Sequence, residues 1–316
     1  MSFSLDVKNE LARVKPAKKC CMLAEIAGFT RMCGTVSLVG GGKMKLILTT
    51  ENAAVARHYK SLIKDYFDVD ATAAVGSNVS SLKKGKVYTL TLDDREDQKA
   101  EPVLRETGIL LIREGMNYIS DGIYSSIIRS KCCRKSYLRG LFLGSGTMTD
   151  PKKAYQLEYI CNTEILAGDV RKLINTFTDL SPKIIARGKS HIVYIQEAEQ
   201  VGDMLNLMGA HNQFFVLEDI RMMKNARGMA NRIANCDNAN MDKTLNAAEK
   251  QIAAIKKIEG AKGLGSLPSK LREAAETRLA HPDISLQELA DMMDPPLKKS
   301  GLNHRLQKII EIAEKL

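Results

Sequence analysis

Along the first two thirds of the chain, the spacing of apolar and polar positions predicts one order of elements that occurs twice. A helix with small residues on its apolar face comes first, and two hairpins and two further helices follow it. In the first half these are strands at 35–39 and 43–49, a helix at 52–67, a hairpin around 83–86 leading into a strand at 87–92, and a helix at 101–114. In the second half they are a strand at 155–161, a helix at 164–177, strands at 183–187 and 191–195, and a helix at 197–208.

The leading helix of each half carries the same motif. Lys19-Cys20-Cys21 is followed by Gly28 and Gly34, and Lys131-Cys132-Cys133 is followed by Gly140 and Gly146, with the same offset along the chain for every matched position. Two helices that cross at a two-fold axis need small residues where their backbones touch. The repeat therefore predicts two similar halves that meet along these helices, with the four glycines at the crossing.

Ile26-AGFTRMCG and Leu138-RGLFLGSG resemble the signature of the LAGLIDADG homing endonucleases. In that family an acid before the last glycine of each motif holds the catalytic metal, and two-metal cleavage needs such acids from both halves. Here those positions are Cys33 and Ser145. The resemblance implies that the fold is kept, that cleavage is lost and that the chain is not an enzyme. The alternative is a nuclease with relocated acids, for which the nearest candidates have no matched partners at the offset of the repeat: Asp121, Asp150 and Glu158.

The composition of the chain favours a polyanionic partner. The chain has 316 residues, a net charge of +10 and a pI near 9.2, and 44% of its residues are hydrophobic. No apolar run is long enough to cross a bilayer and the amino-terminal stretch is charged, so neither a membrane span nor a signal peptide is expected. The charge agrees with a polyanionic partner but does not identify it. Double-stranded DNA is the partner expected from the carboxyl-terminal helices described below, and no small-molecule substrate is expected.

The cysteines give no expectation of a metal or another cofactor. Seven cysteines with two adjacent pairs favour a reducing cytoplasm over a disulfide framework. There is no CxxC or HExxH motif, and neighbouring cysteines on one helix point about 100° apart. We therefore expect no metal site.

Basic residues gather at the predicted hairpins, where two sheets forming a saddle would carry them on the rim of a concave face. They are candidates for phosphate contact, although solvated turn charges and a protein-docking role for the saddle are open alternatives. These residues are Lys83, Lys84, Lys86, Arg187 and Lys189.

The last fifty residues predict a helix-turn-helix. Apolar faces indicate helices near 268–280, 285–293 and 300–314. Ser285 and Glu288 form a capping box, and Ser300 is the expected N-cap of the last helix. The Asn-rich segment from Arg227 to Thr244 lacks an apolar stripe and is expected as a linker before a helix at 244–259. The expected divisions are 1–125 and 126–221 for the two halves, 222–265 for the linker and helix, and 266–316 for the helix-turn-helix.

No acid occurs between Leu297 and Ile310, whereas bases and short polar side chains suited to base edges and phosphates are frequent. A helical protein-interaction module is the alternative. The candidate DNA-binding residues are Ser285, Gln287, Lys298, Lys299, Ser300, Asn303, His304, Arg305, Gln307 and Lys308.

Leu286-QELADMMDPPLKKSGLNHRLQKI resembles the DNA-binding helices of region four of bacterial sigma factors. Together with the Cys-Cys repeat, the second glycine motif and Asn231-RIANCDNAN, it resembles the WhiA family of bacterial DNA-binding regulators over essentially the whole chain. The resemblance implies an α+β protein: a duplicated, degenerate αββαββα nuclease domain, followed by an all-α helix-turn-helix domain.

This resemblance also carries functional expectations. The family is linked to transcriptional control of sporulation and septation in actinobacteria, and to cell division and chromosome segregation in firmicutes. It implies a cytoplasmic, nucleoid-associated, site-specific DNA-binding protein, with another regulator or RNA polymerase as a candidate protein partner. A cryptic metal-dependent DNA endonuclease and an architectural chromosome-binding protein without sequence preference are the alternatives.

Overall fold

The computed structural model describes residues 2–77, 85–96 and 99–316. Its contacts divide the chain into two compact units, Met1–Met223 and Lys224–Leu316. The first unit combines helices with two four-stranded sheets and a hairpin, and the second is helical. This arrangement confirms the predicted fold class. Within the described residues, no helix is long and apolar enough to cross a membrane.

Each half of the first unit runs α-β-β-α-β-β-α. The first half comprises α2 (Lys19–Cys33), β1 (Gly34–Leu38), β2 (Met44–Thr50), α3 (Ala53–Phe67), β3 (Thr72–Ser77), β4 (Lys86–Asp93) and α4 (Ala100–Glu106). The second comprises α5 (Lys131–Ser145), β7 (Gly146–Met148), β8 (Leu157–Cys161), α6 (Glu164–Ile174), β9 (Lys183–Arg187), β10 (Ser190–Ile195) and α7 (Ala198–Met208). The sheets have equivalent antiparallel orders, β1-β2-β4-β3 and β7-β8-β10-β9. The predicted duplication is therefore confirmed in topology.

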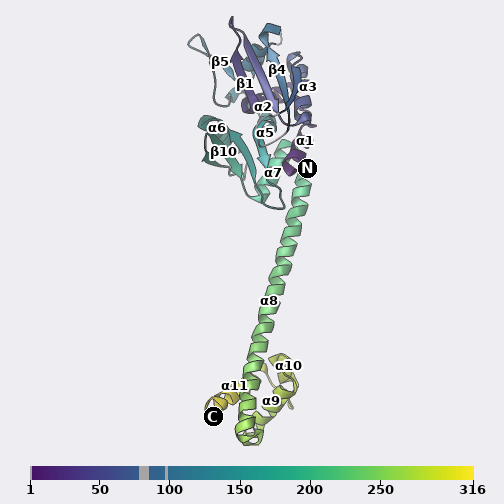
Figure 1. Cartoon of the computed structure of the whole chain (residues 1–316), viewed down its shortest axis with the longest axis vertical. Coiled ribbons are helices and arrows are strands. Elements are labelled where there is room, and N and C mark those ends of the chain that lie inside the picture. The colour runs from purple at the N-terminus through teal and green to yellow at the C-terminus, as the bar shows by residue number, and fades with distance from the viewer. Residues whose placement is uncertain (1, 78–84, 97–98) are drawn as a thin grey trace. The chain divides into compact units, whose positions relative to one another are not determined.

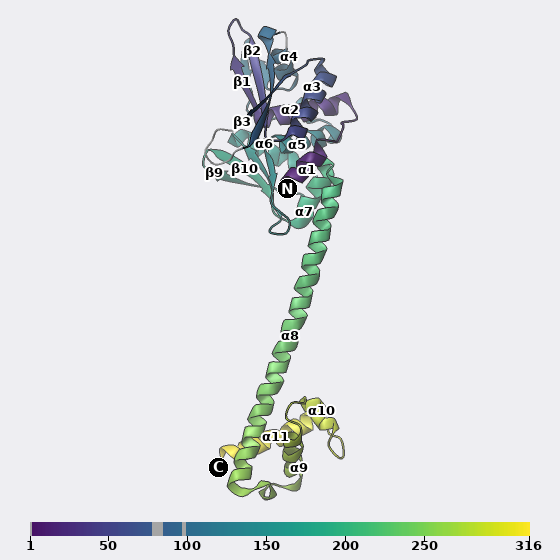
Figure 2. The same cartoon turned by 45° about the vertical axis from the view of Figure 1, so that its right-hand side comes forward.

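Helices α2 and α5 lie side by side where the two halves meet (Figures 1 and 2). A Cβ on Gly28 would lie 2.4 Å from the carbonyl oxygen of Tyr137, and one on Gly140 would lie 2.2 Å from that of Glu25. The offset from Glu25 to Tyr137 equals the offset from Gly28 to Gly140. The contact is thus reciprocal about a local two-fold axis, and only glycine allows the backbones to approach this closely.

Gly34 and Gly146 do not belong to this crossing, contrary to the prediction. They are the first residues of β1 and β7. A Cβ at Gly34 would meet Thr30, and one at Gly146 would meet Phe142, so each would collide with the helix that precedes it in sequence. These glycines permit the sharp exit from helix to strand. Gly144 lies in the crossing instead, because its Cβ would come within 2.7 Å of the Cβ of Met32.

The helix predicted at 101–114 is wrong in its second part. Helix α4 ends at Glu106, and Gly108 has a φ of 68°, the left-handed conformation that commonly terminates helices. The following residues form the hairpin of β5 (Leu110–Arg113) and β6 (Met116–Ile119). Its turn contains Gly115 at a φ of 80°.

The Asn-rich segment expected as a linker is helical, because α8 runs without interruption from His211 to Lys262. The two backbone amides near its start, those of Asn212 and Gln213, donate to the carboxylate of Glu10 at 2.8 and 3.0 Å, and Glu10 lies in α1 (Phe3–Leu11). Residues 229–243 are all exposed. The missing apolar stripe reflects the absence of a packing face, and once a helix has nucleated it propagates at little cost.

The second unit packs the last turns of α8 against α9 (Ser269–Ala280), α10 (Leu286–Asp291) and α11 (Lys299–Glu314). The predicted capping box is confirmed: the Ser285 hydroxyl accepts from the Glu288 amide, and the Glu288 carboxylate accepts from the Ser285 amide. Ser300 is not the N-cap of α11. Lys298 holds that position without a side-chain cap, and Ser300 lies in the first turn.

Candidate nucleic-acid interface

The core of the second unit fixes which face of α11 reaches solvent. Leu302, Leu306, Ile309 and Ala313 recur at helical spacing and are buried against α9, α10 and α8. The turn between α10 and α11 is held by the amide of Leu297, which donates to the Ala290 carbonyl at 2.9 Å. The buried side chains and the hydrogen bond of the preceding turn together set the orientation of α11.

Most of the predicted DNA-binding residues are exposed together on α11 and at its start. Lys298, Lys299, Ser300 and Asn303 line a shallow open depression of about 560 Å³, with Leu286 at the first turn of α10 completing it. His304, Gln307 and Lys308 continue the same polar side along the helix and are exposed. The depression lies where the amino-terminal turns of both helices meet, which is the part of a helix-turn-helix that approaches a major groove.

Two predicted residues of α10 are engaged within the domain. The Ser285 hydroxyl serves the capping box, and its hydrogen bonds lower the pKa of Glu288. Gln287 is exposed and donates to Asp291 Oδ1 at 2.9 Å. The first contact caps the start of α10, and the second joins its first and last turns.

Arg305 departs from the predicted face. Its guanidinium donates to Glu273 Oε2 and to the Lys270 carbonyl, each at 3.4 Å, and both partners lie on α9. Helical spacing accounts for this, because residue 305 follows Leu302 by three positions and precedes Ile309 by four. Arg305 therefore lies at the edge of the core and braces α11 against α9.

We expect Arg305→Ala to lower the free energy of unfolding by about 1 kcal/mol, because it removes a partly screened ion pair and the packing of its aliphatic stem. Preference between DNA sites should persist. Denaturant midpoints and competition between duplexes measure the two effects, with the exposed Lys308→Ala as the control for stability. A loss of site preference without a loss of stability would instead indicate that Arg305 contacts DNA bases.

The predicted basic turns of the first unit are described only in part. Lys86 is exposed at the start of β4, and Arg187 and Lys189 are exposed at the β9–β10 turn. Lys83 and Lys84 lie outside the described residues. Because the sheets share one topology, strands β3 and β4 hold the same places in the first sheet as β9 and β10 in the second.

Cys33 and Ser145, which the resemblance to the nucleases aligns with metal-binding acids, are the last residues of the crossing helices. The Cys33 thiol donates to the Phe29 carbonyl at 3.2 Å, and burial raises its pKa to about 12. The Ser145 hydroxyl donates to the Ile160 carbonyl at 2.9 Å. Both groups thus serve local backbone contacts.

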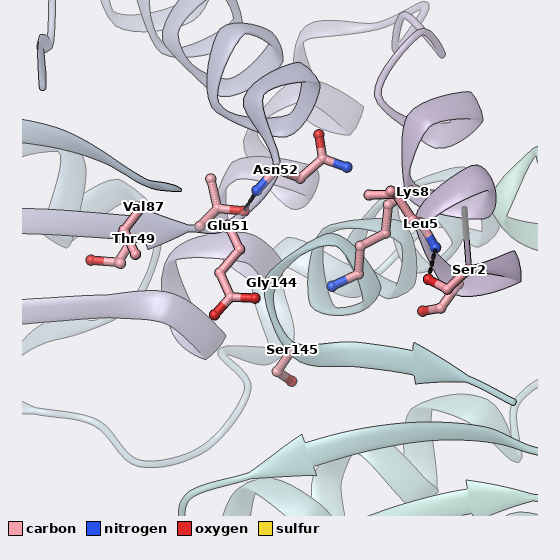
Figure 3. Close-up of a pocket in the computed structure, with 11 residues that line it drawn as sticks. Ser2, Leu5, Lys8, Thr49, Glu51, Asn52, Val87, Gly144 and Ser145 are labelled. Atoms are coloured by element: carbon pink, nitrogen blue, oxygen red, sulfur yellow. Dashed lines mark hydrogen bonds between the residues drawn. The ribbon is translucent and has the colours of Figure 1, made fainter. Parts of the chain in front are cut away.

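A lysine from α1, to which no sequence pattern assigned a role, lies beside these positions. Lys8 and Glu51 point into a pocket of about 690 Å³ whose wall includes Gly144 and Ser145 (Figure 3). Burial lowers the pKa of Lys8, while the neighbouring Cys33 and Glu51 oppose that shift. The pocket beside the end of α5 therefore holds one amine and one carboxylate.

The three acids considered for a relocated nuclease site do not converge. Asp150 accepts from the Lys152 amide at 2.9 Å in a turn, Glu158 lies in β8 beside Thr147, and Asp121 lies on the loop after β6. Over residues 2–77, 85–96 and 99–316, one group of three or more His, Cys, Asp or Glu side chains is placed to share an ion, and it contains no acid.

That group is the two cysteine pairs. The sulfur atoms of Cys20, Cys21, Cys132 and Cys133 all lie within 4.8 Å of one another. Neighbouring cysteines of one helix point apart, but the crossing of α2 and α5 brings the two pairs together, which the spacing within one pair does not reveal. The equal offset of the two pairs within the repeat was the sequence signal that could have predicted this cluster.

The comparisons with known proteins agree along the whole chain. Residues 19–110 match the WhiA N-terminal LAGLIDADG-like domain, 134–227 the WhiA LAGLIDADG-like domain, and 230–313 the WhiA C-terminal HTH domain. The chain is 45% identical over 316 residues to a probable cell division protein WhiA from Thermoanaerobacter pseudethanolicus, covering all of this chain and 98% of that protein. Another so named, from Alkaliphilus metalliredigens, is 41% identical with the same coverage.

A solved structure supports the same fold. The crystal structure of full-length WhiA from Thermatoga maritima is similar with a TM-score of 0.61 and 25% identity, covering 100% of this chain and 99% of that one.

Proposed function

Because the chain belongs to the WhiA family, we propose that it is a non-enzymatic, site-specific DNA-binding protein of the nucleoid. Its role would be transcriptional regulation in the cell-division programme, including chromosome segregation, and sporulation in lineages that sporulate. The name of its relatives, probable cell division protein, supports the division role. The HTH match supports DNA binding.

The observation that carries this proposal is the polar face at the start of α11. Asn303, His304 and Gln307 are exposed on one side of this helix and offer donors and acceptors to base edges. Lys298, Lys299 and Lys308 flank them and are proposed to contact phosphates, with Ser300, Ser285 and Gln287 at the groove edge. The net charge of +10 supports a polyanionic partner.

The absence of catalysis is proposed from the charges at the ends of the crossing helices. Cys33 and Ser145 replace the two metal-binding acids, and the amine of Lys8 points into the adjoining pocket. Mg²⁺ is usually held by several carboxylates and water, and the pocket offers one carboxylate, Glu51, which has the amine of Lys8 as a neighbour.

For the two sheets of the first unit, expected from sequence to form a saddle, we propose a docking role for another regulator or RNA polymerase. The carboxyl-terminal helices would then be the part that contacts bases. Glu158 on β8 opposes phosphate at that surface, although Lys86, Arg187 and Lys189 remain candidate phosphate contacts.

Selection of bound duplexes from a random pool by the full chain in Mg²⁺, with recovered strands sequenced and checked for cuts, tests the proposal. We expect an enriched motif in intact strands. Uncut DNA without a motif would favour an architectural role, and cut strands would contradict the non-enzymatic assignment.

With the selected site in hand, Asn303→Ala should reduce preference for it over random duplex by about 10-fold, since one base contact contributes about 1–3 kcal/mol. Lys298→Ala should weaken binding to both duplexes alike and reduce the salt slope by about 1. Fluorescence anisotropy over a salt series measures both effects. Lys315→Ala, past the end of α11, is the control for charge. Equal losses for Asn303→Ala and Lys298→Ala would remove the base-reading assignment.

A further inference from the structure

Four thiols meet where the first turns of α2 and α5 lie together. Cys20 and Cys21 are the second and third residues of α2, and Cys132 and Cys133 hold the same places in α5. Cys21 and Cys133 are buried, whereas Cys20 and Cys132 are exposed. The local two-fold that relates Gly28 to Gly140 therefore relates one half of the cluster to the other. Cys33 and Ser145 lie at the opposite ends of these helices.

We propose that Cys20, Cys21, Cys132 and Cys133 bind one Zn²⁺ as a closed, four-thiolate structural site that ties the two halves of the first unit together. Zn–S bonds of ~2.3 Å in a tetrahedron separate the sulfurs by ~3.8 Å. Since all four sulfurs already lie within 4.8 Å of one another, each pair has to close by about 1 Å at most to reach that geometry. The exposed pair gives the ion a route from solvent.

The chemistry of the donors selects the metal. The cluster offers four sulfurs and no carboxylate or imidazole, which favours a thiophilic d¹⁰ cation over Mg²⁺ or Ca²⁺. Four protein ligands fill the coordination shell of zinc, and a filled shell is typical of structural sites. This site is therefore distinct from the carboxylate metal positions of a nuclease and does not rest on the proposed DNA-binding function.

The surroundings bring positive charge to the cluster. Each cluster half lies in the first turn of a helix, where the positive end of the macrodipole stabilises an anion. Lys18, Lys19 and Lys131 adjoin the cysteines in sequence. Zinc replaces the protons that the thiols still carry, and each displaced proton passes to solvent.

A disulfide is the competing use of these sulfurs. Cys20 and Cys21 are neighbours in a regular helix, where the backbone does not bring their sulfurs to bonding distance, so only bonds between α2 and α5 are available. All four are free thiols in the structure. Oxidation is therefore a named outcome of the test below.

The test uses the full chain, purified with reductant, stripped with chelator and then loaded with ZnCl₂ or CoCl₂ without oxygen. We expect one Zn²⁺ per chain by elemental analysis after gel filtration, and an intense sulfur-to-metal charge-transfer absorption with Co²⁺. The double variant Cys20→Ser/Cys132→Ser should lose both signals, while Cys236→Ser, an exposed cysteine of α8, should keep them. Zinc should raise the Tm of the wild type and of Cys236→Ser and leave the Tm of the double variant unchanged.

Both replaced cysteines are exposed, so serine leaves no cavity at either place, and far-ultraviolet circular dichroism checks that the variant folds. Several results would overturn the site: zinc content near zero in the wild type, equal zinc in wild type and double variant, or no charge-transfer band. A mass loss that shows an α2–α5 disulfide in air, together with no zinc uptake by the reduced protein, would assign these sulfurs to redox chemistry instead.

Discussion

Replacing Gly140 by alanine should lower the free energy of unfolding of the first unit by about 3 kcal/mol, the upper end of the range for overpacking. The added methyl would lie 2.2 Å from the Glu25 carbonyl oxygen and 2.9 Å from the Phe29 amide nitrogen. Both atoms belong to a helix backbone, so no side-chain rotation relieves the clash, and α2 and α5 have to separate along their whole contact. For a unit of this size the Tm should fall by roughly 6–12 °C, measurable by calorimetry.

Gly168→Ala is the matched control for this change. Gly168 lies in the middle of α6, and a Cβ there meets nothing within 4 Å. Alanine should stabilise that helix by up to about 1 kcal/mol, because glycine is the poorer helix former. Gly28→Ala should match Gly140→Ala, since its methyl would meet Tyr137 and Leu141, the equivalent positions of the other helix. A Gly140→Ala protein as stable as the wild type would contradict the close crossing.

The repeated order of elements was predictable because each helix and strand has its own local sequence pattern. Alternating apolar residues mark β2, whose inward positions are Met44, Leu46 and Leu48, and Asn52 caps α3 as the start of its apolar pattern indicates. The crossing itself could be predicted from Gly28 and Gly140, since their equal offset shows that both helices present a small residue at equivalent points.

The features that sequence did not predict depend on residues brought together by the fold. The cysteine cluster joins one pair from each half of the repeat, and Lys8 reaches the ends of α2 and α5 from a helix to which no pattern assigned a role. Neither is visible from periodicity within one element. The position of Arg305 differs from these, because counting three and four residues from Leu302 and Ile309 places it beside the core without any tertiary information.

A charged network buried beside the crossing has the second large expected effect. Glu25 is fully buried and Arg139 is 6% exposed. The Arg139 guanidinium donates to Glu25 Oε2 from Nε at 2.9 Å and from a terminal nitrogen at 2.6 Å, and it also donates to the Met208 carbonyl at 2.9 Å. His58 Nε2 lies 2.8 Å from the other carboxylate oxygen. The network links α2, α3, α5 and the end of α7, and therefore both halves.

Glu25→Leu should lower the free energy of unfolding by about 3–5 kcal/mol, because it leaves the Arg139 guanidinium buried without its counter-ion. The double variant Glu25→Leu/Arg139→Met should recover most of that loss, since apolar side chains of similar size replace buried ion pairs at little cost. Denaturant unfolding of both single variants and the double variant gives the coupling energy between the two residues.

The exposed pair Lys60–Asp70, at 3.2 Å, supplies the control: Asp70→Ala should change stability by less than about 1 kcal/mol. If the double variant were no more stable than Glu25→Leu alone, the loss would come from helix packing rather than from the stranded charge, and the network would not be what holds α2, α5 and α7 in register.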